Sequence, residues 1–138
     1  MTDEEQYNEL AFYTLAHPAP SFIHQHVVDA YAAQHATEAT KPITIVFALV
    51  GLYLYLEKNF SGRQVQKAHM QLAKFRKTWT RPSLPAAFGS VVISDVTAAP
   101  AGEPRDAQIR AWCVSVWAAW RESHTEIAAL VRDELGIG

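Results

Sequence analysis

The sequence predicts an all-α protein: an up-down bundle of four or five helices with a long Pro/Gly-rich loop before the last one. Through most of the 138 residues, apolar side chains recur at the three- and four-residue spacing of amphipathic helices. The most apolar run, residues 43–56, has the length of a buried helix, and no turn signal appears before Asn59 to favour strands instead. The length fits one domain, residues 1–138.

Start and stop signals place the individual helices. Thr2 and Glu5 form a capping box that opens the first helix, Ser61 is placed to cap the fourth, and Gly136 ends the last. Prolines at residues 42 and 82 separate the middle helices from their neighbours. The predicted helices cover approximately residues 3–16, 21–36, 42–56, 61–79 and 105–135.

The longest stretch without a helical pattern is residues 82–104. Several prolines and two glycines interrupt it, which predicts a long ordered loop or a lid before the last helix. Within it, the β-branched residues 91–93 are candidates for a short strand.

Composition narrows the classes of function. The formal net charge is only −2, so no electrostatic attraction to nucleic acid is expected. Cys113 is the only cysteine, which excludes an internal disulfide and a cysteine-rich zinc site. The N-terminus is acidic, and the most apolar run is shorter than the roughly 20 residues that cross a bilayer. We therefore expect a cytoplasmic protein with neither nucleic acid nor a membrane as partner.

Three histidines form the predicted functional site. His24, His69 and His124 each lie on the apolar arc of a different predicted helix. If consecutive helices run antiparallel, all three reach the same end of the bundle. Three imidazoles from separate helices can hold one divalent transition metal, such as Zn²⁺, Ni²⁺ or Fe²⁺, with a coordination position left open. The predicted chemistry is metal-assisted hydrolysis or transfer on a small-molecule substrate, under the 82–104 loop.

Other polar residues are assigned supporting roles. His17 and His26 are expected at a helix end or on the surface, and His35 is expected to cap the end of the second helix. A second group of residues is placed to orient the metal-bound imidazoles through hydrogen bonds. This group consists of Asp29, Tyr31, Gln34 and Glu57.

Two metal-free alternatives use the same residues. In the first, the histidines only satisfy core hydrogen bonds and the tryptophan-rich last helix forms a homodimer or partner surface, with Trp117 exposed at its edge. In the second, Tyr53, Trp79 and Trp120 line a pocket for an apolar or heterocyclic ligand. Cys113 is interpreted as an inert core thiol in either case.

Residues 24–35 and 116–124 resemble the paired signatures of a bacterial family of unknown function. These signatures are His-x4-Asp-x-Tyr-x2-Gln-His and Val-Trp-x2-Trp-x2-His-His, and they bring no known reaction. Ser123 replaces the first histidine of the second signature, and the cysteine pair that many members carry near the N-terminus is missing. The matching residues are His24, Asp29, Tyr31, Gln34, His35, Trp117, Trp120 and His124.

The arrangement is also similar, more remotely, to the DinB/YfiT-type helical bundles. In those proteins histidines from separate helices hold a divalent metal, and some members act as thiol transferases or hydrolases. This second resemblance implies a metal without fixing a chemistry.

Overall fold

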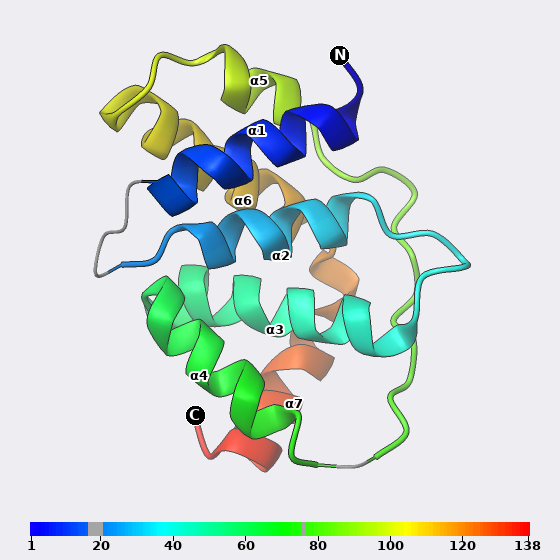
Figure 1. The fold of residues 1–138 in the computed structure, drawn as a ribbon. Helices are drawn as coiled ribbons and strands as arrows, with labels where there is room; N and C mark the ends of the chain where they lie inside the picture. The colour runs from blue at the N-terminus through cyan, green and yellow to red at the C-terminus, as the bar shows by residue number, and fades with distance from the viewer. Residues whose placement is uncertain (17–20, 76) are drawn as a thin grey trace.

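The computed structural model describes residues 1–16, 21–75 and 77–138 and confirms the all-α class (Figure 1). These ranges contain seven α-helices and one short 3₁₀ helix, and no strand. None of the helices described is both long and apolar enough to cross a membrane. In chain order the elements are α1 (Asp3–Ala16), α2 (His24–Gln34), α3 (Pro42–Lys58), α4 (Gly62–Leu72), α5 (Ile93–Ala98), α6 (Glu103–Ala119), η1 (Arg121–Ser123) and α7 (His124–Leu135).

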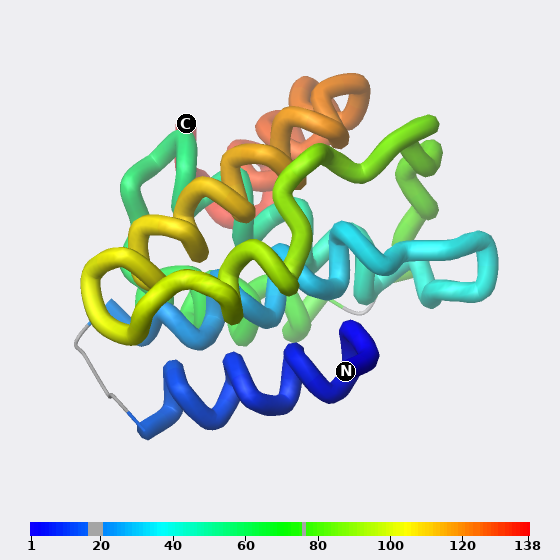
Figure 2. Tube along the Cα trace, turned by 90° about the horizontal axis from the view of Figure 1, so that it is seen from above, coloured from blue at the N-terminus to red at the C-terminus, as the bar shows by residue number. Residues whose placement is uncertain are grey.

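Helix α3 is the centre of the bundle, as its apolar sequence predicts. It contacts α2, α4, α6 and α7, and Ile45, Leu49 and Leu52 are fully buried in it. Figure 1 shows α1, α2 and α3 stacked side by side with alternating direction, while α6 crosses behind them. Seen from above, α1 forms the outer edge of the molecule (Figure 2). Helix α2 therefore packs against α1, α3, α4 and α6 and has no broad solvent face.

The predicted last helix is wrong in one respect, because it is broken into two. Helix α6 ends at Ala119, η1 turns the chain, and α7 starts at His124. The break is fixed by Trp120, whose buried indole Nε1 donates to the carbonyl of Ala33 at 3.2 Å. After this corner α7 can pack on α3 and α4 instead of continuing past the bundle.

Two smaller predictions also need correction. Helix α4 ends at Leu72, not near Trp79. The candidate strand at residues 91–93 is not found in the described chain; Ile93 instead begins the short helix α5, where the Asp95 carboxylate accepts a hydrogen bond from the amide of Val92 at 2.9 Å.

Residues 77–92 form an irregular segment, which we call the strap. Near its beginning, the guanidinium of Arg81 donates to the carbonyl of Thr40 in the turn between α2 and α3. Near its end, the hydroxyl of Ser115 accepts two backbone hydrogen bonds, at 3.1 and 3.3 Å. The predicted loop at residues 82–104 is therefore present in part: α5 interrupts its second half, and both ends of the strap are anchored.

Candidate functional site

The structure does not bring the three predicted metal ligands together. His24 Nδ1 lies 2.9 Å from the Thr14 hydroxyl, while Nε2 of His69 and Nε2 of His124 each lie 2.7 Å from a different main-chain carbonyl. Within the described ranges, no group of three or more His, Cys, Asp or Glu side chains is placed to hold a metal ion. Each imidazole is instead directed to a partner on its own side of the bundle.

The carbonyl partners define the protonation of two of these rings. A carbonyl oxygen only accepts, so Nε2 of His69 and of His124 must carry the proton and cannot coordinate a metal in this conformation. His124 also stacks on the Trp117 indole, with ring centroids 3.7 Å apart. Burial lowers the pKa of His24 and of His69, which favours neutral rings. Coordination of a metal through Nε2 would therefore require His69 and His124 to leave their present carbonyl partners.

The residues predicted to orient the metal ligands mostly join helices to one another. Gln34 uses its whole amide: Oε1 accepts from Trp112 Nε1 at 2.8 Å, and Nε2 donates to two strap carbonyls at 3.2 and 2.8 Å. Tyr31 stacks between Tyr7 and His35, with centroid distances of 4.2 and 4.1 Å. These contacts tie α2 to α1, to α6 and to the strap.

Glu57 and the remaining histidines have similar local roles. Glu57 accepts a hydrogen bond from Trp117 Nε1 at 3.4 Å, so it lies beside the Trp117 stack. His35 caps α2 as predicted, because its Nδ1 lies 3.0 Å from the carbonyl of Tyr31, and its Nε2 lies 3.0 Å from Asp3. His17 lies outside the described residues.

Asp29 is fully buried and only partly hydrogen-bonded. Its Oδ1 accepts from Gln25 Nε2 at 3.2 Å, whereas Oδ2 has no hydrogen-bond partner among the described residues. The carboxyl packs directly on Gly51 of α3, where any Cβ would overlap it. Burial raises the pKa of the Asp29 carboxyl well above its usual range, which favours its neutral form.

His26 lies in the first turn of α2, at a helix end as expected, but not on the surface. It is only 3% exposed, and its ring stacks on Tyr55 with centroids 3.5 Å apart. Its Nδ1 has no hydrogen-bond partner in the described part of the chain. Burial and, to a lesser extent, the nearby Arg110 guanidinium lower the pKa of His26 to about 4, so the imidazole is neutral at neutral pH.

His26 and Tyr55 line a pocket of about 300 Å³, which we call the His26 pocket. It lies where α2 begins, α3 ends and α4 begins, at the left-hand side of the molecule in Figure 1. The other lining residues are neutral, and most of them carry hydrogen-bonding groups. They are Ser21, Ile23, Asn59, Phe60, Ser61 and Gln64.

Three local features of the backbone build this pocket. Asn59 ends α3 in the left-handed region, with φ of 57°, and Phe22 has φ of 49° just before α2. The chain at Phe22 passes so close to Gly62 that a Cβ there would overlap the Phe22 carbonyl. Ser61 and Gln64 then form the capping box that starts α4. A positive φ at a phenylalanine is uncommon and is a feature that clusters at functional sites.

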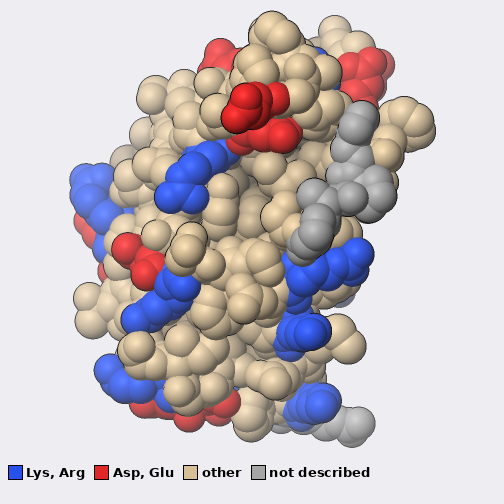
Figure 3. All heavy atoms as spheres, turned by 90° about the vertical axis from the view of Figure 1, so that its left-hand side faces the viewer, with Lys and Arg blue, Asp and Glu red and all other residues tan. Residues whose placement is uncertain are grey.

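The surroundings of the pocket are positively charged. The Arg110 guanidinium carbon lies 5.2 Å from the Tyr55 ring centroid, and that of Arg63 lies 4.2 Å from the Phe22 ring centroid. Neither arginine forms an ion pair within the described chain. Figure 3 shows this face, with lysine and arginine side chains on both sides of a broad area free of both charges. The positive end of the α4 dipole adds to the same potential.

The comparisons with known proteins identify a family without an activity. Residues 4–121 match the Family of unknown function (DUF5946). The match covers most of the 138 residues, so the chain belongs to this family. No curated protein and no solved structure matches the chain.

Proposed function

Starting from a family that has no assigned activity, we propose that this protein binds a small organic anion in the His26 pocket. The observation that carries the proposal is a buried, neutral imidazole whose Nδ1 has no hydrogen-bond partner among the described residues. It lines a pocket flanked by two guanidinium groups that form no ion pair with any of these residues. Leaving a buried polar group unpaired costs about 1–3 kcal/mol, so a ligand that pairs with it would gain binding energy.

The lining groups favour an anion with an organic part. The Tyr55 hydroxyl and the amides of Asn59 and Gln64 can donate to a carboxylate or phosphate. None of the described lining residues is acidic, so none of them repels a negative charge. Ile23 and Phe60 supply apolar contacts for the rest of the molecule. The volume is at the lower end of the usual range for small-molecule sites, which suits a compact ligand.

Ligand-observed NMR with benzoate, phenyl phosphate and the uncharged benzamide tests the proposal. We expect saturable binding of at least one of the two anions, and binding of benzamide weaker by about tenfold or more, because the positive potential acts only on a charge. Arg110→Gln should weaken the anion by a similar factor. The matched control is Arg132→Gln, which removes an exposed arginine of α7 that lies beside Asp133.

Equal binding of benzamide and benzoate would contradict the anion selectivity. Equal effects of Arg110→Gln and Arg132→Gln would show that the anion binds elsewhere. The absence of binding by all three compounds, with unchanged helix content by circular dichroism, would overturn the proposal for this ligand size.

Metal-dependent hydrolysis or transfer remains a second prediction, and so does a relationship to the DinB-like helical bundles. Its remaining support is His24, whose Nε2 has no hydrogen-bond partner among the described residues. Elemental analysis of purified protein and of His24→Ala tests it: loss of a stoichiometric metal in the variant would support a site at His24, and metal-free wild-type protein that takes up no added Zn²⁺ would contradict one.

The remaining predictions concern location and association. A cytoplasmic location and a bacterial origin stay predictions. A homodimer also stays a prediction, but Trp117 is only 6% exposed within one chain and so offers little surface for it. The expectation that Trp117 lies at an exposed edge is wrong, because its indole packs between Tyr53 and His124.

A further inference from the structure

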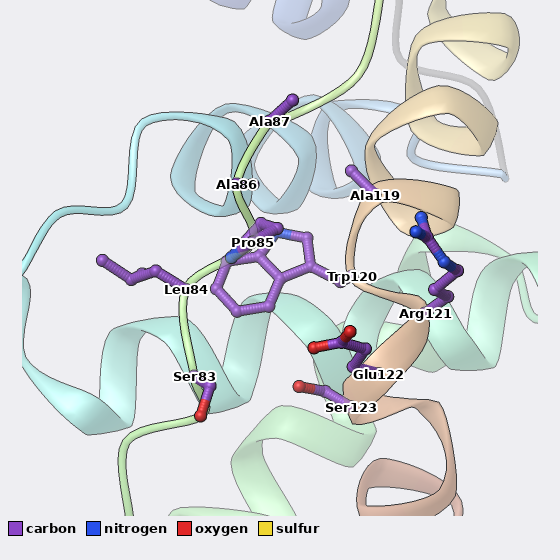
Figure 4. Close-up of a pocket in the computed structure, with 10 residues that line it drawn as sticks. All are labelled: Ser83, Leu84, Pro85, Ala86, Ala87, Ala119, Trp120, Arg121, Glu122 and Ser123. Carbon is purple, nitrogen blue, oxygen red and sulfur yellow. The ribbon is translucent and has the colours of Figure 1, made fainter.

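A second cavity, of about 410 Å³, lies between the strap and the corner that joins α6 to α7 (Figure 4). Strap residues 83–87 form one wall and residues 119–123 form the other. Figure 4 shows the Trp120 indole between the two walls, next to Pro85. The cavity is separate from the His26 pocket, because the two share no lining residue.

The strap wall contains backbone groups that are free to form hydrogen bonds with a ligand. The strap is hydrogen-bonded through Arg81 before residue 83, and through Phe88 and Val91 after residue 87. Between these anchors, residues 83–87 make no hydrogen bond to any other described residue. Their carbonyls, and their amides apart from that of Pro85, are therefore available along one side of the cavity.

The opposite wall carries two charges of opposite sign. Neither Arg121 nor Glu122 forms an ion pair or a side-chain hydrogen bond in the described chain, although both line the cavity. In Figure 4 the Arg121 side chain extends upward from the corner, while the Glu122 carboxylate lies below the Trp120 indole. A zwitterion can place each of its charges beside the residue of opposite charge. A simple anion, in contrast, is repelled by Glu122, and a simple cation is repelled by Arg121.

We propose that this cavity binds a free α-amino acid. Arg121 receives the carboxylate, Glu122 receives the ammonium group, and the amino-acid side chain packs toward Leu84, Pro85 and Trp120. The Ser83 and Ser123 hydroxyls and the free backbone groups of the strap complete the hydrogen bonds. Pairing with both charged groups at once gives selectivity over molecules that carry only one charge.

Isothermal titration calorimetry with the standard amino acids is the first test. For the amino acid that binds most tightly, the amine without the carboxylate and the acid without the ammonium group are then titrated. We expect each analogue to bind about tenfold more weakly or worse, because one charged contact is lost. Glu122→Gln and Arg121→Gln should each weaken the amino acid by a similar factor. Glu103→Gln, an exposed residue at the start of α6, is the matched control and should have no effect.

Three outcomes would overturn the inference. They are the absence of binding by every amino acid with the fold intact, equal binding of the single-charge analogues, and unchanged binding in both Arg121→Gln and Glu122→Gln. Benzoate binding at the His26 pocket is measured separately, so a negative result for amino acids would not count against the proposed anion site.

Discussion

The two ends of α2 differ in whether their buried polar atoms have hydrogen-bond partners. At the C-terminal end, Gln34 satisfies its whole amide and both ring nitrogens of His35 face oxygen atoms. Nearer the N-terminal end, one nitrogen of His26 and one oxygen of Asp29 are buried without a hydrogen-bond partner in the part of the chain that the structure describes. Helix α2 thus carries side chains that connect it to the rest of the fold at one end, and side chains with unsatisfied hydrogen-bonding atoms nearer the other end.

This difference indicates where function lies. A fully paired polar group stabilises the packing around it, whereas an unpaired one costs free energy in the free protein. Local rules of this kind are broken mainly at functional sites. The unpaired His26 lines a pocket, while Gln34 lies among its partners. Signature residues can therefore be structural even when their chemistry suggests ligation.

The largest expected effect on stability comes from removing the hydrogen bonds of Gln34 at the C-terminal end of α2. Gln34→Ala leaves the indole nitrogen of the buried Trp112 and two strap carbonyls without their partner. We expect the free energy of unfolding, measured by urea denaturation, to fall by about 3 kcal/mol. The control is Gln71→Ala on the exposed face of α4, which should change stability by less than about 0.5 kcal/mol. Similar losses in both variants would show that Gln34 is not a structural junction.

The second effect concerns acid stability and the unpaired end. Because the pKa of His26 falls from 6.5 unfolded to about 4 folded, the unfolded chain binds the extra proton first as the pH falls. The stability that neutral His26 contributes is complete above pH 6.5 and is lost as the pH falls through about 4. The loss is on the order of 3 kcal/mol.

His26→Phe keeps an aromatic ring beside Tyr55 and removes this titration. Its free energy of unfolding should therefore depend less steeply on pH between 6.5 and 4 than that of the wild type. Parallel pH profiles for the two proteins would contradict the burial of a neutral imidazole.

A smaller effect of opposite sign is expected at Asp29. Its folded pKa lies above the ordinary value of 3.8, so the unfolded chain loses its proton first as the pH rises, and stability decreases upward from about that pH. Asp29→Asn cannot ionise and keeps the oxygen that accepts from Gln25. We expect the variant to be more stable than the wild type at neutral pH, with a difference that increases as the pH rises. Destabilisation at every pH would show that Asp29 has an ionic partner in the folded state.

The sequence predicts the fold class because α3 is apolar on nearly every face, which only a central helix satisfies. It does not predict the break at Trp120, because the apolar spacing continues from α6 into α7 without a glycine or proline. The corner depends on the hydrogen bond from Trp120 to Ala33, a contact between residues far apart in the sequence. Such tertiary contacts are not visible in a local pattern.

The difference between local patterns and tertiary contacts also explains why the predicted histidine site was not found. Spacing along one helix shows which way His69 and His124 point, but not which neighbouring group they meet. Both meet carbonyl oxygens instead of each other. His26 is predicted on the surface or at a helix end because it lies opposite the main apolar arc of α2. The several helices packed around α2 bury that side as well, a feature that only the assembled bundle reveals.

The most direct test of the central claim is an NMR titration of the histidine ring nitrogens with benzoate and with phenyl phosphate at neutral pH. We predict that the His26 resonances, which should be those of a neutral ring before addition, shift saturably with at least one of these anions. The His35 resonances, from the paired end of α2, should stay unchanged. A charged His26 ring in the free protein, or anion binding that leaves the His26 resonances unchanged, would contradict the account.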